Sequence, residues 1–417
     1  MTLDPAPAES ATETVAVVLS GAAARGAFQA GALAELVPAL DREGLKPTIW
    51  LGTSAGGINA ALWGARAHLG PDVAGEQVLE VWRRMNDDHV YRPLPWSLAR
   101  SGAQYVAGAV LCAGTGATSV LDTAPLRRTA ETELDERRLE VNVSDGRLDA
   151  VGVVATRMPA ERDNAAGGTA SGRSVLFLDE HTPGNYSGQP RRALDVVRGP
   201  ITPDHVLASS AIPVAFSPVK VTRPARAAGW YLDGGVRLNT PLHPAVGLGA
   251  TRIVVVSATA TTYGEPPSSQ QTGEMPDVAD AAAQVLNAAL ADRTTEDLAA
   301  LRRRNAMVAQ VSEIGHPDLL TGSTGEPYRV LEFLEVSPPP GEMGRLAADV
   351  FGRRTHGLGR FTELDNWVLG QALRGAGDGV GRSELLSYLF FDEDYFAKSI
   401  ELGRKTAAAA LARGWQH

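Results

Sequence analysis

The sequence has a single cysteine, Cys112, so no disulfide can form within the chain. Its histidines and cysteine show none of the spacings typical of metal sites, and we expect neither a metal nor another cofactor. No apolar run approaches the roughly eighteen residues that a transmembrane helix needs. No basic block is present, and 39 Lys and Arg against 48 Asp and Glu give a net charge of −9. These absences argue against a membrane-spanning protein and a general nucleic-acid binder.

Residues 1–14 carry acidic side chains, no Lys or Arg, and no apolar segment. They do not have the pattern of a secretory signal, and we expect a short disordered tail. Without a signal or disulfides, the expected location is the cytoplasm, with a peripheral membrane contact as a further expectation. A secreted effector exported without a cleavable signal stays open as an alternative, and the sequence leaves the oligomeric state undetermined.

Glycine is abundant, and the informative glycines follow strand-like segments. Val15–Leu19 is a continuous apolar run typical of a buried parallel strand, and the Gly/Ala turn Ser20–Gly26 follows it. Apolar residues at a spacing of four then predict a helix through residue 40, before a second strand at Thr48–Leu51. Strand, turn, helix and strand in this order predict an α/β fold with a mostly parallel sheet covered by helices.

The rest of the chain extends this pattern. Further strands are expected at Val151–Ala155, Ser174–Leu178, Trp230–Asp233 and Arg252–Ser257. We expect an α/β core over residues 15–260, with an inserted cap at 90–130, and a mainly helical C-terminal part over 261–417 that returns one strand at about 329–336.

Gly52–Thr53–Ser54–Ala55–Gly56 fits the pattern G-x-S-x-G. A nucleophile on a sharp strand-to-helix turn needs small neighbours so that the backbone can bend and the hydroxyl stays exposed. The helix that follows would place N–H groups and the positive end of its dipole near Ser54. The plainer interpretation is a glycine-rich turn whose serine caps the helix.

A Ser-His-Asp triad is disfavoured by the order of the elements. Only one convincing strand precedes the strand that leads to Ser54, whereas α/β-hydrolases place several strands there. None of the eight histidines stands out as a partner. A carboxylate is the better candidate: Asp233 ends a short apolar strand and is followed by Gly234 and Gly235. An Asp-Gly pair is also a strong turn signal without any catalytic role.

These three segments, in this order, resemble the patatin-like phospholipase family. The segments 208–213 and 239–242 also resemble the family's sequence on either side of the Asp-Gly-Gly turn. The resemblance implies a three-layer α/β/α fold, Ser54 as the nucleophile and Asp233 as the base of a Ser–Asp dyad. It further implies an oxyanion cradle made by the backbone of the following residues: Gly21, Ala22, Ala23, Ala24, Arg25 and Gly26.

The chain departs from the family at this cradle, where three alanines stand in place of glycines. Alanine keeps its N–H group but resists a positive φ. The expected function is hydrolysis of (lyso)phospholipid or related lipid acyl esters. An acyltransferase using the same acyl-enzyme, or a catalytically weak binding protein with this fold, are the alternatives. The apolar stretches Pro95–Val110 and Leu385–Phe396 are candidates for contact with a membrane or an acyl chain, but helices packed on the sheet are the expected interpretation of either stretch alone.

Overall fold

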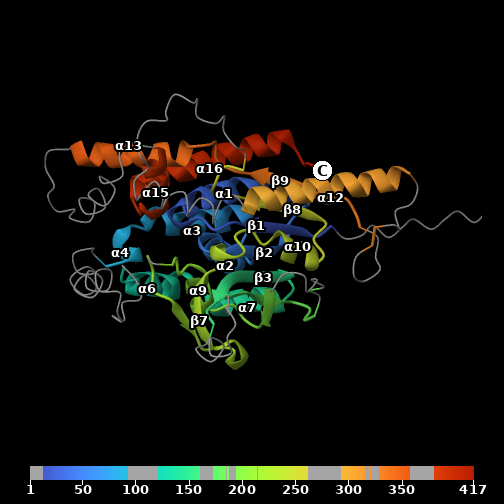
Figure 1. Cartoon of the computed structure of the whole chain (residues 1–417), viewed down its shortest axis with the longest axis horizontal. Helices are drawn as coiled ribbons and strands as arrows, with labels where there is room; N and C mark the ends of the chain where they lie inside the picture. The colour runs from blue at the N-terminus through green and yellow to red at the C-terminus, as the bar shows by residue number, and fades with distance from the viewer. Residues whose placement is uncertain are drawn as a thin grey trace, which may run out of the picture.

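The computed structural model describes residues 13–92, 121–159, 172–184, 186, 194–213, 215–261, 293–314, 320–321, 328–356 and 380–417. These residues form a nine-stranded sheet with helices on both faces, which confirms the predicted three-layer α/β architecture (Figure 1). Its strands are β1 (Val15–Leu19), β2 (Pro47–Thr53), β3 (Ala150–Arg157), β4 (Arg173–Glu180), β5 (Leu194–Arg198), β6 (Val219–Val221), β7 (Gly229–Asp233), β8 (Arg252–Val256) and β9 (Glu332–Val336).

The strand order is β5-β4-β3-β2-β1-β8-β9, with β7 paired to the end of β3 and to β6. The pairs along β3, β2, β1, β8 and β9 are all parallel. β4 runs antiparallel to β3, and so does β7, which lies where β2 has already ended. The carboxyl ends of the parallel strands therefore lie along the same side of the sheet. The antiparallel strand β7 lies at that side, beyond the end of β2.

Helices cover the sheet; most of the described ones lie between strands in the chain, and the last three follow β9. They are α1 (Gly26–Arg42), α2 (Ala55–Ala65), α3 (Pro71–Arg84), α4 (Asp87–Val90), α6 (Ala124–Glu133), α7 (Glu136–Ser144), α9 (Pro203–Ser209), α10 (Leu242–Gly247), α12 (Arg293–Glu313), α13 (Glu342–His356), α15 (Val380–Leu389) and α16 (Glu393–Arg413). The short turns η1 (Ala23–Arg25), η2 (Ala225–Ala227) and η3 (Gly234–Val236) are 3-10 helices.

Two apolar cores lie on opposite faces of the sheet. The alternating residues Val17 and Val18 of β1 belong to different cores, as expected for a strand that is buried on both faces. The first core includes side chains of α1, α2, α3 and α16, and the second includes those of α10 and α12. Every residue of β1 is buried, which explains why its sequence is uniformly apolar.

The C-terminal helix α16 packs closely on α1 because each helix has a glycine at the crossing. A Cβ at Gly31 would lie 2.2 Å from the carbonyl oxygen of Ile400, and one at Gly403 would lie 2.1 Å from that of Phe28. Side chains at these positions would force the helices apart. Figure 1 shows α16 beside α1, so these two helices, which are far apart in the sequence, lie in one layer.

Each predicted strand lies close to an observed one, and the segment expected at about 329–336 is β9, beside β8; β5 and β6 were not predicted. Residues 1–12 of the expected tail, residues 93–120 of the expected cap and the stretch Pro95–Val110 lie outside the described residues. In Leu385–Phe396, Tyr388, Phe390 and Phe396 are almost fully buried, which confirms the interpretation of this stretch as packed helix and not as a membrane contact. Among the described residues, no helix has the length and apolar character to cross a membrane.

Candidate active site

Ser54 lies in the turn between β2 and α2. Its φ of 56° and ψ of −129° place a non-glycine residue in left-handed backbone. A Cβ at Gly52 would lie 2.2 Å from the carbonyl oxygen of Gly56, and one at Gly56 would lie 2.5 Å from that of Ser20. Both glycines are therefore required for the turn to close. The Ser54 side chain makes no capping hydrogen bond to α2, so the helix-cap interpretation does not account for it.

The backbone of Ser54 is fixed by a second serine. The Ser54 N–H donates to Oγ of Ser209 at 2.8 Å, and that hydroxyl donates to the carbonyl oxygen of Val154 at 2.5 Å. Ser209 lies at the end of α9 and is fully buried. It therefore connects the turn of β2 and α2 to β3. In the sequence, Ser209 is visible only as part of the segment 208–213, and its role could not be inferred there.

Asp233 is held at the end of β7 by its own backbone. Its N–H donates to the carbonyl oxygen of Ala211 at 2.9 Å, and its carbonyl oxygen accepts from Oγ1 of Thr156 at 2.9 Å. The N–H of Gly235 donates to the Asp233 carboxylate at 2.7 Å. A Cβ at Gly234 would lie 2.3 Å from the carbonyl oxygen of Val154, so this position requires glycine. The Asp-Gly-Gly turn therefore holds Asp233 close to β3.

The structure brings Asp233 and Ser54 together. Both residues are almost fully buried, and the Ser54 side chain lies close enough to the Asp233 carboxyl to lower its pKa. Burial raises the pKa of Asp233 to about 6, although hydrogen bonds from Ser54 and Gly235 oppose the increase. Asp233 remains ionised at neutral pH, yet it is a stronger base than an exposed aspartate. This is the arrangement that proton abstraction from a serine hydroxyl needs.

The loop Gly21–Gly26 packs against this pair, but only its central amides are free to bind an oxyanion. The N–H of Gly21 donates to Asn239, at 2.9 Å to Oδ1 and 3.2 Å to the carbonyl oxygen. The N–H groups of Arg25 and Gly26 donate to carbonyl oxygens within the loop. In the described part of the chain, the N–H groups of residues 22–24 have no acceptor. Of the six residues predicted to form the cradle, three therefore have backbone N–H groups without an acceptor in the described part of the chain.

Ala23 adopts a φ of +48°. Alanine in this left-handed region costs roughly 1–2 kcal/mol relative to a right-handed backbone. The chain therefore forms a left-handed turn at this point of the loop even though alanine disfavours it. The strain must be offset by the contacts that surround the loop.

Buried polar side chains form hydrogen bonds to both ends of the loop Gly21–Gly26. Nε2 of Gln29 donates to the carbonyl oxygens of Ser20, at 2.9 Å, and Val256, at 3.1 Å. Asn59 donates to the carbonyl oxygen of Gly26 at 3.0 Å and accepts from Nε1 of Trp82 at 2.8 Å. Sequence reasoning did not identify these side chains. The signal would have been their polarity inside helices that are otherwise apolar.

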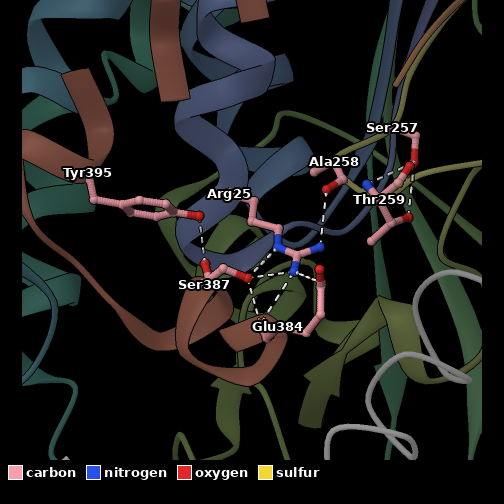
Figure 2. Close-up of polar contacts among 7 residues, drawn as sticks. All are labelled: Arg25, Ser257, Ala258, Thr259, Glu384, Ser387 and Tyr395. Atoms are coloured by element: carbon pink, nitrogen blue, oxygen red, sulfur yellow. Dashed lines mark hydrogen bonds and ion pairs between the residues drawn. The ribbon is translucent and has the colours of Figure 1, made fainter. Parts of the chain in front are cut away.

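The Arg25 side chain contacts α15, the helix that precedes α16 (Figure 2). Of the histidines, His205 is occupied by structural contacts. One ring nitrogen accepts from the N–H of Thr202 at 3.2 Å, and the other lies 2.8 Å from the carbonyl oxygen of Arg223. Burial lowers the pKa of His205, consistent with a neutral ring in this position. Among the described residues, no group of three or more His, Cys, Asp or Glu side chains is placed to hold a metal ion.

Comparison with known proteins identifies a family. The model of the family described as "Patatin-like phospholipase" matches residues 17–246. A search of curated proteins returned no match. Among solved structures, VipD from Legionella pneumophila is 12% identical, with a TM-score of 0.33 over 97% of this chain and 68% of that chain. ExoU, in its complex with SpcU from the type III secretion system of Pseudomonas aeruginosa, is 18% identical, with a TM-score of 0.23 over 96% and 75%. Both likenesses are too low to support an argument about function.

Proposed function

Because the chain belongs to the patatin-like phospholipase family, whose members are lipid acyl hydrolases, we propose that it cleaves acyl esters of phospholipids or lysophospholipids through Ser54 and Asp233. The observation that carries this proposal is the contact between the Ser54 hydroxyl and a desolvated carboxylate whose pKa is raised to about 6. Ser54 also lies at the start of α2, whose N-terminal dipole favours developing negative charge.

The proposed reaction proceeds in two steps. Asp233 takes the proton of the Ser54 hydroxyl as its Oγ attacks the ester carbonyl carbon. The resulting oxyanion accepts hydrogen bonds from the N–H groups of residues 22–24, and the tetrahedral intermediate collapses to an acyl-enzyme. The departing alcohol receives the proton from Asp233. Water then attacks the acyl-enzyme, Asp233 takes a proton from that water, and Ser54 regains its hydrogen as the free acid leaves.

The direct test is intact-mass analysis after treatment with a lipophilic fluorophosphonate, followed by peptide mapping. We expect one adduct on Ser54, absent from Ser54→Ala and formed at least 100-fold more slowly in Asp233→Asn. The Ser144→Ala variant is a suitable control, because the Ser144 hydroxyl is exposed and donates to the carbonyl oxygen of Val141 at 3.1 Å; this variant should label like the wild type. An adduct at another serine, or equal labelling of Ser54→Ala, would refute the proposal.

Product analysis with a phospholipid separates the enzyme hypotheses. Release of free acid in water supports hydrolysis, whereas transfer of the acyl group to added glycerol would identify an acyltransferase. Labelling of Ser54 without turnover of any ester would favour the binding-protein alternative.

We further propose that the hairpin of β6 and β7 is the part of the protein that contacts the membrane. Trp230 is 53% exposed and Met158 is 39% exposed. Lys220 pairs with Trp230 across the hairpin, and the N–H of Met158 donates to the carbonyl oxygen of Trp230 at 2.9 Å. The three side chains therefore form a row on one face of adjacent strands. Trp230 is three residues before Asp233 on β7, so the row lies roughly 10 Å along the strand from Asp233 and on the opposite face.

Charge supports a negatively charged lipid surface as the partner. Although the whole chain has a net charge of −9, no acidic residue occurs between Asp204 and Asp233, where Lys220 and Arg226 are found; Arg223, in the same stretch, forms an ion pair with Glu136. Tryptophan favours the membrane–water interface, and each cation near an anionic membrane contributes about 1 kcal/mol.

Sedimentation with phosphatidylcholine vesicles, prepared with and without about 30% of the anionic lipid phosphatidylserine, tests the membrane contact. Each cation near the anionic surface should contribute about 1 kcal/mol to binding. Binding should require the anionic lipid and should weaken several-fold in Trp230→Ser and Lys220→Glu. Val73→Ser changes an equally exposed side chain on α3 and should bind normally. If both hairpin variants bind like the wild type, the membrane contact lies elsewhere.

A further inference from the structure

The strained loop that carries the free N–H groups is attached to the C-terminal part of the chain through one side chain. The N–H of Arg25 donates to the carbonyl oxygen of Ala22 at 3.0 Å, so Arg25 closes the turn that contains Ala23. The position of Arg25 therefore sets the directions of the amides at residues 22–24. Any group that fixes the Arg25 side chain also restrains this turn.

Helix α15 fixes that side chain through several contacts (Figure 2). Nε of Arg25 donates to Oγ of Ser387 at 2.8 Å, and one terminal nitrogen donates to the carbonyl oxygen of Glu384 at 3.3 Å. The same nitrogen forms an ion pair with the Glu384 carboxylate. The guanidinium group lies 3.8 Å from the centre of the Tyr388 ring. These contacts come from successive turns of one helix and together set both the place and the plane of the guanidinium group.

The contacts occur in a water-poor environment, where they are strong. The Arg25 side chain is 3% exposed and the Glu384 side chain is 17% exposed. Burial lowers the pKa of Arg25, but the neighbouring Tyr388 and Glu384 side chains outweigh this effect, and the net pKa is raised. Arg25 therefore stays charged, and its charge is matched by that of Glu384.

Helix α15 is itself anchored to the body of the protein. The Tyr395 hydroxyl, at the start of α16, donates to the carbonyl oxygen of Ser387 at 3.0 Å, as Figure 2 shows. Tyr395 and Phe396 are fully buried in the first core, where α16 packs on α1. The restraint on Arg25 is thus transmitted from a rigid layer and not from a loose segment.

From these contacts we propose that α15 positions the oxyanion loop, and that Glu384 and Ser387 are positioning residues for the reaction at Ser54. They act through Arg25, which keeps the N–H groups of residues 22–24 directed at the developing oxyanion. α15 lies outside the family match at residues 17–246, so the family region alone would be an incomplete active site. This inference rests on the proposed hydrolase function.

Steady-state kinetics of Ser54-dependent ester hydrolysis test the inference. The Ser387→Ala variant removes the acceptor for Nε of Arg25 and leaves the ion pair with Glu384 in place. We expect kcat to fall about tenfold with KM unchanged, because a displaced oxyanion donor acts on the transition state. Arg25→Lys, which keeps the charge but loses the planar group, should lower kcat at least as much.

The decisive measurement is a double-mutant cycle. If Ser387 acts through Arg25, Ser387→Ala should lower kcat no further in the Arg25→Lys background. Leu139→Ala is the control, since Leu139 is fully buried in the first core but lies on α7 and not on α15. It should lower the unfolding temperature without lowering kcat. Glu384→Gln, which keeps the size of the side chain, provides a second variant if Arg25→Lys does not fold.

The outcomes separate this inference from the proposed function. If wild type and Ser54→Ala hydrolyse esters equally, the proposed function itself fails. If activity depends on Ser54 but folded Ser387→Ala and Glu384→Gln keep the wild-type kcat, the hydrolase proposal stands and the positioning role of α15 is refuted. Effects of Ser387→Ala and Arg25→Lys that multiply in the double variant would also refute it.

Discussion

Replacing Asp233 by asparagine should abolish catalysis and at the same time stabilise the folded protein. Asparagine has nearly the same shape, and its side-chain oxygen can still accept the N–H of Gly235, which now donates to the carboxylate at 2.7 Å. What it removes is a negative charge in a buried position. Burial raises the pKa of Asp233 from 3.8 to about 6, so the ionised form is disfavoured in the folded state.

The size of the effect follows from the difference in pKa between the unfolded and folded states. Because the folded protein keeps the proton to higher pH, its stability relative to the unfolded chain falls as the pH rises from about 4 to 6. Above that window the loss is complete and amounts to about 3 kcal/mol, since one pKa unit corresponds to 1.36 kcal/mol. At pH 4.5 the loss is only about 1 kcal/mol.

Urea unfolding of wild type and Asp233→Asn at pH 8 and pH 4.5 measures this difference. The variant should gain up to about 3 kcal/mol at pH 8 and clearly less at pH 4.5. Asp179→Asn is a matched control, because burial raises the pKa of Asp179 to about 6 as well. It should be stabilised in the same direction but remain fully active. A gain for Asp233→Asn that is equal at both pH values, or a loss at pH 8, would refute the desolvation argument.

Four further outcomes are expected at and around Ser54. With Asp233 as the base, kcat/KM should fall about tenfold per pH unit below pH 6 and level off above it, as a pH–rate profile would show. Gly52→Ala should prevent the turn from closing and lower both activity and the unfolding midpoint, because its Cβ would lie 2.2 Å from the carbonyl oxygen of Gly56. Ser209→Ala should cost about 1–3 kcal/mol in urea unfolding, because it leaves the Ser54 N–H without its acceptor. Ala23→Gly should leave stability within about 1 kcal/mol of wild type, since relief of the left-handed strain offsets the added entropy of the unfolded chain; a large loss would contradict the observed φ.

The fold could be predicted well where burial on both faces dictates the sequence. β1 and β8 are wholly or almost wholly buried, so their residues must be apolar and their limits are visible in the sequence. The crossing of α1 and α16 could not be predicted in this way. Gly31 and Gly403 are ordinary small residues in their own helices, and only their close approach shows that they mark a contact.

The same division holds in the candidate active site. Ser54 and Asp233 could be found because the glycines beside them are required by sharp turns, and such glycines form short local patterns. Ser209, Gln29 and Asn59 support the site through contacts between distant segments. No local spacing encodes such contacts, so these roles became visible only in three dimensions.

The sequence by itself determined most of the strands of the sheet, the turn that holds Ser54 and the turn that holds Asp233. These features depend on local burial and on the freedom of glycine, both of which can be read from neighbouring residues. The tertiary structure alone decided which amides of the loop remain free, how far the pKa of Asp233 rises and that Arg25 contacts α15. These properties depend on the distance between segments that the chain brings together only when it folds.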